Sequence, residues 1–293
     1  MKVHNAIPLL LSCLRRWNNV PSEAQFRSEY AHPLRSVVGN FFEDFHEVLL
    51  ELDWKAYRDQ ALKLDPDFEE KRFQQNLKLV EDLFGFRLEG EVFLLGTFQN
   101  MDGFARFDQG THKVFLGLDE NHLNGKYIDV LTTHELTHVA RESRPEVWEG
   151  FGLNPKMSRK DFLEYQPVIE HLFGEGFSCA VSEILVPGEE VWNYTYQSKE
   201  SIELVYKNSS MLSRRIHREI QDPNGDYGTL YGIEPIFSHY VWGSAWIKKI
   251  LQEHAGGDPR SLVSHCSKTF LEDALRFHLT SIDSTPTAKC QPL

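Results

Sequence analysis

Apolar residues recur at helical spacing along most of the chain, before and after one short strand-like section. Residues 37–52 (VVGNFFEDFHEVLLEL) carry apolar side chains on one helical face, which predicts an amphipathic helix. Residues 65–85 begin with Asp-Pro and end in glycine, the signature of a capped helix. The apolar run at residues 6–14 has arginines after it and no cleavage-site pattern, so we interpret it as a first helix and not as a signal peptide. These patterns predict a helical N-terminal lobe over residues 1–87.

The strand-like section follows this lobe. Residues 91–98 and 112–119 are rich in β-branched and aromatic side chains and are bounded by turn residues. Residues 103–108 (GFARFD) lie between them. This pattern predicts a small antiparallel sheet of two or three short strands.

The helical period then returns and continues towards the C-terminus. One helix is expected from residue 125 to just before Pro145, and others over residues 161–186, 199–221 and 235–254. Asp258-Pro259 predicts the start of one more helix, because aspartate suits the N-cap and proline the first turn. Helices, a small sheet and helices again indicate a mainly helical α+β protein.

Composition and charge narrow the possible partners. The chain has 293 residues and a formal net charge of −12. It has no basic stripe, which argues against nucleic acid and against anionic membranes, because phosphate neutralisation needs clustered cations. No apolar run reaches the roughly 18 residues of a membrane-spanning helix. The widely spaced cysteines, without a CxxC pair, indicate free thiols in the cytoplasm: Cys13, Cys179, Cys266 and Cys290.

The sequence LTTHELTHVARE (residues 131–142) carries the first candidate chemistry. His134 and His138 are four residues apart, so they share one face of a helix and can bind one metal ion. Glu135 is rotated by about 100° from His134 and suits a base beside a metal-bound water. The competing interpretation is a solvated pair of histidines on a surface helix.

A third ligand is expected in HLFGEGFSCAVSE (residues 171–183), because catalytic zinc usually has three protein ligands. Glu175 is the candidate: it lies in an apolar stretch between two glycines, which suit a close approach of another backbone. His171 and Cys179 lie on the same helical face. We interpret them as a polar contact and a small buried residue, with one of them a possible orienting partner of a ligand.

Together these segments resemble the glutamate-zincin (gluzincin) metallopeptidases. HELTH (134–138) is similar to the thermolysin branch, and GEGFS (174–178) to the NEGFA segment of the aminopeptidase-N branch. HYVWGSAWIKKILQEHAGGD (239–258) is similar to the Tyr-x-x-Gly segment of that branch. The chain also resembles bacterial proteins described as predicted zinc-dependent proteases. The resemblance covers roughly residues 90 to 275.

The resemblance implies a zinc-dependent peptidase acting on a peptide or protein substrate. It implies one Zn²⁺ on His134, His138 and Glu175, with Glu135 as general base and Tyr240 as the donor to the oxyanion. It further implies a zincin-like catalytic domain over residues 88–293, with the sheet and active-site helices at 88–187 and a helical part at 188–293. Three residues remain alternatives for the role of Tyr240: Tyr227, Tyr231 and His239.

The sequence also departs from the family pattern. The GxMEN segment that binds a substrate's amino terminus is missing, so aminopeptidase specificity is not implied, although residues 103–108 suit an edge strand that pairs with an extended peptide. Cys179 stands where the thermolysin branch has an aspartate, and Glu183 or Glu142 is the candidate to replace that aspartate. These departures keep two alternatives open: a catalytically silent zincin-fold binding or regulatory module, and a zinc hydrolase of a non-peptide amide or ester.

Overall fold

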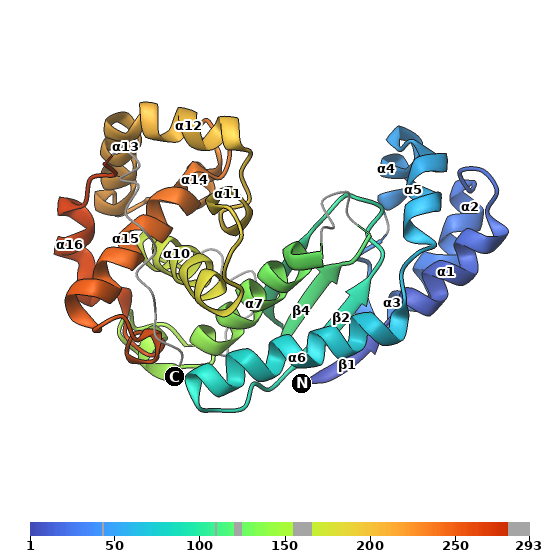
Figure 1. The fold of residues 1–293 in the computed structure, drawn as a ribbon, viewed down its shortest axis with the longest axis horizontal. Helices are drawn as coiled ribbons and strands as arrows, with labels where there is room; N and C mark the ends of the chain where they lie inside the picture. Colours follow the sequence, from blue (N-terminus) through green and yellow to red (C-terminus); the bar gives the residue numbers. More distant parts are fainter. Residues whose placement is uncertain (43, 109, 120–124, 155–165, 281–293) are drawn as a thin grey trace.

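The computed structural model describes residues 1–42, 44–108, 110–119, 125–154 and 166–280. The described chain is mostly helical with one small sheet, which confirms the α+β class. In Figure 1 it forms a crescent, with the N-terminal helices in blue at one end and the C-terminal helices in orange and red at the other. No helix in the described ranges is long and apolar enough to cross a membrane.

Helices, a sheet and helices again follow one another as expected, but one unpredicted strand precedes the first helix. The N-terminal part contains β1 (Lys2–Asn5), α1 (Ile7–Arg16), α2 (Glu23–Phe26), the π-helix η1 (Arg27–Ala31), α3 (His32–Val38), α4 (Phe45–Glu51), α5 (Trp54–Ala61) and α6 (Pro66–Phe84). The sheet is completed by β2 (Glu91–Leu95), β3 (Gly103–Asp108) and β4 (Thr111–Gly117). The later elements are α7 (Gly125–Glu142), α8 (Pro145–Glu149), α10 (Val168–Leu185), α11 (Val191–Tyr194), α12 (Lys199–Lys207), α13 (Ser209–Gln221), α14 (Gly228–Tyr231), α15 (Ser238–His254), the 3-10 helices η2 (Pro259–Ser261) and η3 (Ser267–Phe270), and α16 (Leu271–Arg276).

The sheet differs from the prediction in direction and in membership. Its strand order is β1-β2-β4-β3, and only β3 and β4 pair antiparallel, whereas β1 with β2 and β2 with β4 are parallel. The antiparallel prediction was therefore wrong for β2 with β4, because β4 lies between β2 and β3 instead of continuing a meander. β1 was not predicted. It belongs to the proposed N-terminal lobe but pairs with β2, which lies beyond residue 87. The domain boundary at residue 87 stays a prediction.

Several predicted helices begin or end elsewhere. The continuous helix over residues 37–52 is wrong, because Gly39, at a φ of 65°, ends α3 and α4 begins only at Phe45. The predicted helix over residues 199–221 is divided at Asn208 into α12 and α13. Asp258 does cap the next turn, but that turn is the short η2. Part of the helix predicted from residue 161 lies outside the described residues, and α10 begins at Val168.

Other predicted helices are confirmed. Asp65 caps α6 through its side chain, and Gly85 ends α6 in the left-handed conformation. α7 ends before Pro145 as expected. Cys13, Cys179 and Cys266 are free thiols, as predicted, while Cys290 lies outside the described residues.

α7, α10 and α15 position the functional residues. α7 packs against the sheet and α6 on one side and against α10 on the other (Figure 1). α10 crosses α15 where two glycines meet: a Cβ built on Gly176 would lie 2.3 Å from the carbonyl carbon of Gly243. The glycine beside Glu175 and the glycine of the Tyr-x-x-Gly segment are therefore partners in one close helix contact.

Candidate metal centre

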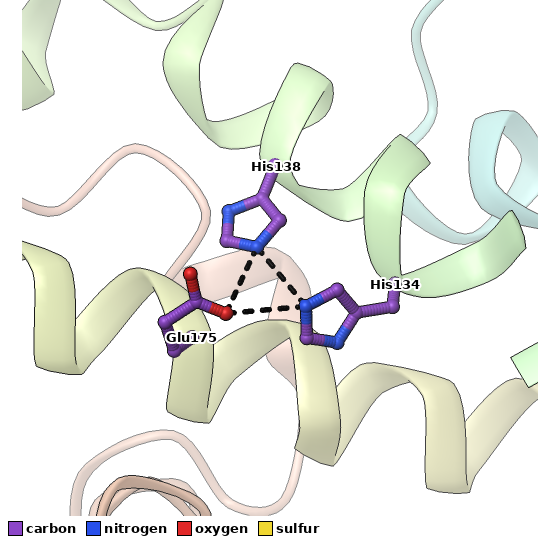
Figure 2. Close-up of side chains that lie close together, drawn as sticks. All are labelled: His134, His138 and Glu175. Carbon is purple, nitrogen blue, oxygen red and sulfur yellow. Dashed lines mark hydrogen bonds and ion pairs between the residues drawn. The ribbon is translucent and has the colours of Figure 1, made fainter. Parts of the chain in front are cut away.

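The three predicted metal ligands come together in a triangle. Nε2 of His134 lies 3.1 Å from Nε2 of His138. Oε2 of Glu175 lies 3.2 Å from the first nitrogen and 3.3 Å from the second. Figure 2 shows both rings and the carboxylate pointing toward one another, the rings from α7 and the carboxylate from α10. A cluster with one donor atom from each residue, buried or nearly so, could hold a metal ion.

The size of the triangle fits a tetrahedral ion. Ligand atoms about 2.05 Å from a tetrahedral zinc lie about 3.3 Å from one another, which matches the three separations of 3.1, 3.2 and 3.3 Å. Hydrogen bonds alone explain the triangle poorly, since each neutral imidazole has a single N–H and cannot direct it along two edges. Two histidines and one glutamate are also a donor set of catalytic zinc sites.

The two rivals for ligation lie outside the triangle. Nε2 of His171 is 4.0 Å from Oε1 of Glu175, and its ring stacks on Tyr227 at 4.2 Å. Sγ of Cys179 lies 3.9 Å from Nδ1 of His134, on the side of the ring that faces away from the triangle. Cys179 therefore contacts a ligand from behind, where it can fix the orientation of the ring.

The two proposed substitutes for the missing aspartate are separated. Glu183 pairs with Lys248 on α15 and does not line the cavity described below. Glu142 does line it, one helical turn beyond His138 on α7. Its Oε2 is 3.7 Å from Nε2 of His112, and neither atom has a hydrogen-bond partner.

Electrostatics at the triangle favour a cation. Burial alone would raise the pKa of Glu175, but His138 and the two imidazole hydrogen bonds hold it well below its usual range. Burial opposes a proton on His138 as well, yet Glu175, with smaller contributions from Glu135 and Glu142, raises the pKa of His138 to about 9. Burial lowers the pKa of His134. The ionised carboxylate therefore attracts positive charge to this point, and a metal ion must displace the proton that it holds there.

Glu135 lies beside the triangle on the wall of the same cavity. Only 6% of the residue is exposed. Burial raises its pKa to about 8, the negative charges of Glu175 and Glu142 act in the same direction, and His138 opposes them. The backbone of Ala105 on β3 hydrogen-bonds to the carboxylate. A carboxyl group tuned to this range can accept and return a proton near neutral pH.

The cavity has a volume of about 680 Å³, within the usual range of small-ligand and peptide sites. One wall is β3 and the loop before it, from Gln99 to Phe107. β3 is an edge strand, because β4 pairs with only one of its sides. Residues of α7 and α10 line the cavity as well, together with further aromatic side chains: Trp148, Tyr196, Tyr227, Tyr231, Phe237 and Tyr240.

The four candidates for a donor to the oxyanion occupy different positions. The ring of Tyr240 lies 6.2 Å from that of His134, and its hydroxyl is 3.3 Å from the hydroxyl of Tyr231. Tyr227 stacks on His171. His239 is fully buried and is not among the residues that line the cavity. The geometry therefore keeps the tyrosines near the triangle and sets His239 behind them.

Sequence reasoning missed Tyr196. Its ring meets the ring of His134 edge-on at 5.1 Å. It follows α11 in a loop, at a left-handed φ of 53°. No motif or helical spacing marks this position, because the loop conformation alone brings the ring onto α7.

Comparisons with known proteins add no relatives: no family model matches the chain, and no curated protein or solved structure is significantly similar to it.

Proposed function

We propose that this protein is a zinc-dependent peptidase with its centre at His134, His138 and Glu175. The observation that carries the proposal is the convergence of these three donor atoms within 4.8 Å of one another, beside a buried Glu135. A cluster built for stability alone would not need a carboxyl group with a pKa of about 8 facing the same cavity.

Each residue has a defined task in this proposal. When bound, zinc lowers the pKa of water and polarises a carbonyl group. Glu135 takes the proton from the attacking water and passes it to the leaving amine, for which its raised pKa is suited. Tyr240 donates a hydrogen bond to the carbonyl oxygen as negative charge develops on it. Cys179 holds the ring of His134 from behind.

The substrate that fits best is an extended peptide. The free side of β3 offers main-chain groups to a peptide strand, and such pairing needs no particular side chain. The aromatic side chains that line the same cavity can pack against apolar side chains of such a peptide. The free thiols support the cytoplasm as the compartment in which the protein acts.

Metal analysis tests the first half of the proposal. We expect one zinc per chain in purified or reconstituted protein. Substitution of Glu175→Gln or His138→Ala should abolish that stoichiometry, whereas Glu146→Gln, an exposed residue on α8, should retain it. Protein without stoichiometric zinc after reconstitution would end the proposal.

A peptide library tests the second half. Wild-type protein should cut a subset of the library, and Glu135→Gln should lose at least about 100-fold in kcat while still binding zinc. Glu146→Gln again serves as the matched control. If zinc-loaded wild-type protein cuts no peptide but binds a partner, the silent binding module replaces the proposal. Turnover of simple amides or esters alone would indicate a non-peptide hydrolase.

A further inference from the structure

Tyr196 carries a buried hydroxyl group without a partner. Of the tyrosine hydroxyls buried in the described part of the chain, this one alone makes no hydrogen bond. The hydroxyl of Tyr194, two residues earlier, donates to the carbonyl of Val186 at 2.6 Å and accepts from the backbone of Glu189. A buried polar group that the protein leaves unsatisfied is rare and calls for an explanation.

The surroundings of Tyr196 connect this hydroxyl with the metal centre. The residue lines the cavity together with His134 and Glu135. Its ring lies edge-on to that of His134 at 5.1 Å and to that of Tyr240 at 6.0 Å. After burial, the carboxylate of Glu135 is the strongest influence that raises the pKa of Tyr196, so the phenol stays a proton donor beside the proposed base.

The backbone of Tyr196 adopts an unfavourable conformation. A non-glycine residue at a φ of 53° is uncommon, and such strain persists only where the surroundings impose it. Gln197 imposes it from both sides: its N–H donates to the carbonyl of Trp192 at 2.9 Å, and its side chain donates to the carbonyl of Ile236 at 2.8 Å. The loop therefore fixes the ring over α7.

Tyr240, the residue implied by the resemblance, differs in one respect. Its hydroxyl is already hydrogen-bonded to that of Tyr231. The hydroxyl of Tyr196 has no such partner to give up when a ligand arrives.

We propose that Tyr196 is a catalytic residue whose hydroxyl donates a hydrogen bond to the carbonyl oxygen of the substrate. This inference rests on the proposed hydrolytic function and adds a second donor beside Tyr240. No bond to Tyr196 forms or breaks. The hydroxyl keeps its proton and stabilises the negative charge that develops on the oxygen.

The test compares Tyr196→Phe with Tyr194→Phe, two substitutions that each remove one hydroxyl from the same segment. Tyr196→Phe should lower kcat by roughly 10²- to 10³-fold, as loss of one oxyanion donor does, with KM, zinc content and melting temperature unchanged. Tyr194→Phe should do the opposite: it breaks the bonds to Val186 and Glu189 and lowers the melting temperature, while the folded protein keeps its kcat.

A binding measurement separates this inference from the proposed function. The probe is a tripeptide analogue with a phosphinate in place of the scissile amide, titrated into zinc-loaded protein by calorimetry. Tyr196→Phe should weaken its binding by about 100-fold, and Tyr194→Phe should not. If wild-type protein cuts peptides and Tyr196→Phe retains wild-type kcat and analogue affinity, the inference is overturned and the function stands.

If wild-type protein cuts no peptide, the proposed function fails and the analogue decides alone. Weaker binding by Tyr196→Phe would still assign the hydroxyl to a bound oxyanion. Equal binding by the variant, or no binding by wild-type protein, would overturn the inference about Tyr196 as well. A fall in melting temperature for Tyr196→Phe, together with unchanged kcat, would make the hydroxyl structural.

Discussion

Two buried charged clusters join α7 to α10, and they differ in how far the protein itself satisfies them. In the first, Arg141 donates to both carboxylate oxygens of Glu170 at 2.8 Å and to the carbonyls of Leu262 and His265 at 3.1 and 2.9 Å. The second cluster lies one turn earlier on α7 and consists of His134, His138 and Glu175. Its three donor atoms lie close together, but they carry too few N–H groups to form a hydrogen bond along every edge of the triangle.

This difference separates a cluster that the protein satisfies by itself from one that could hold a ligand. Every strong donor of Arg141 is used, so nothing is left for a ligand. The triangle at His134, His138 and Glu175 could hold a cation, and the hydroxyl of Tyr196 has no hydrogen-bond partner. Both clusters are buried and contain charged side chains. They differ in whether the hydrogen bonds within the protein satisfy their polar atoms.

Arg141→Met should give the largest loss of stability. It leaves Glu170 buried without its partner, which typically costs about 3–5 kcal/mol in the free energy of unfolding. Urea unfolding measures this loss. Arg141→Met combined with Glu170→Met removes both charges and should recover most of it. Equal stability of Arg141→Met and wild type would contradict the structural role of this cluster.

Zinc removal should act on the second cluster alone. Protein stripped by a chelator should remain folded, and zinc at about 1,000 times its dissociation constant should add about 4 kcal/mol to the free energy of unfolding. Glu175→Gln should lose this gain, while Glu146→Gln keeps it. A gain of the same size in Glu175→Gln would show that zinc binds elsewhere.

What the sequence could predict follows from how local each feature is. His134, Glu135 and His138 were found because spacing along one helix fixes their relation. Glu175 was found because its glycines point to a helix crossing, and Gly176 does meet Gly243 there.

Features that depend on distant segments were not predicted. The parallel pairing of β2 with β1 joins residues 91–95 to residues 2–5, and no local pattern encodes that partner. Tyr196 contacts α7 because its own backbone is left-handed and because Gln197, the next residue, hydrogen-bonds to the carbonyls of Trp192 and Ile236. The break of the predicted helix at Gly39 had a local signal, which the apolar period hid.

The two glycines beside Glu175 test the geometry that presents it. Gly176→Ala should destabilise the protein by about 1–3 kcal/mol, because its Cβ would meet the backbone of Gly243 and push α15 from α10. Gly174→Ala is the matched control, since its Cβ would lie 3.8 Å from the ring of His138, an ordinary contact. The melting temperature and the zinc affinity should both fall in Gly176→Ala and stay unchanged in Gly174→Ala. The reverse order would refute the packing of α10 on α15.

The last expected effect is a pH dependence of the metal-free protein. Burial lowers the pKa of His138, but Glu175, Glu135 and Glu142 together raise it from 6.5 to about 9 in the folded state. The folded protein therefore binds this proton more tightly than the unfolded chain does. The resulting stabilisation is complete below pH 6.5 and is lost as the pH rises through about 9. Burial raises the pKa of Glu135 from 4.5 to about 8. Glu135 therefore also makes the protein less stable as the pH rises, between pH 4.5 and about 8.

Urea midpoints across this range, with chelator present, measure the decline. His138→Gln should flatten its upper part, because glutamine holds no proton beside Glu175, whereas Glu146→Gln should leave it unchanged. A midpoint that rises between pH 6.5 and about 9 in wild-type protein would contradict the pairing of His138 with Glu175.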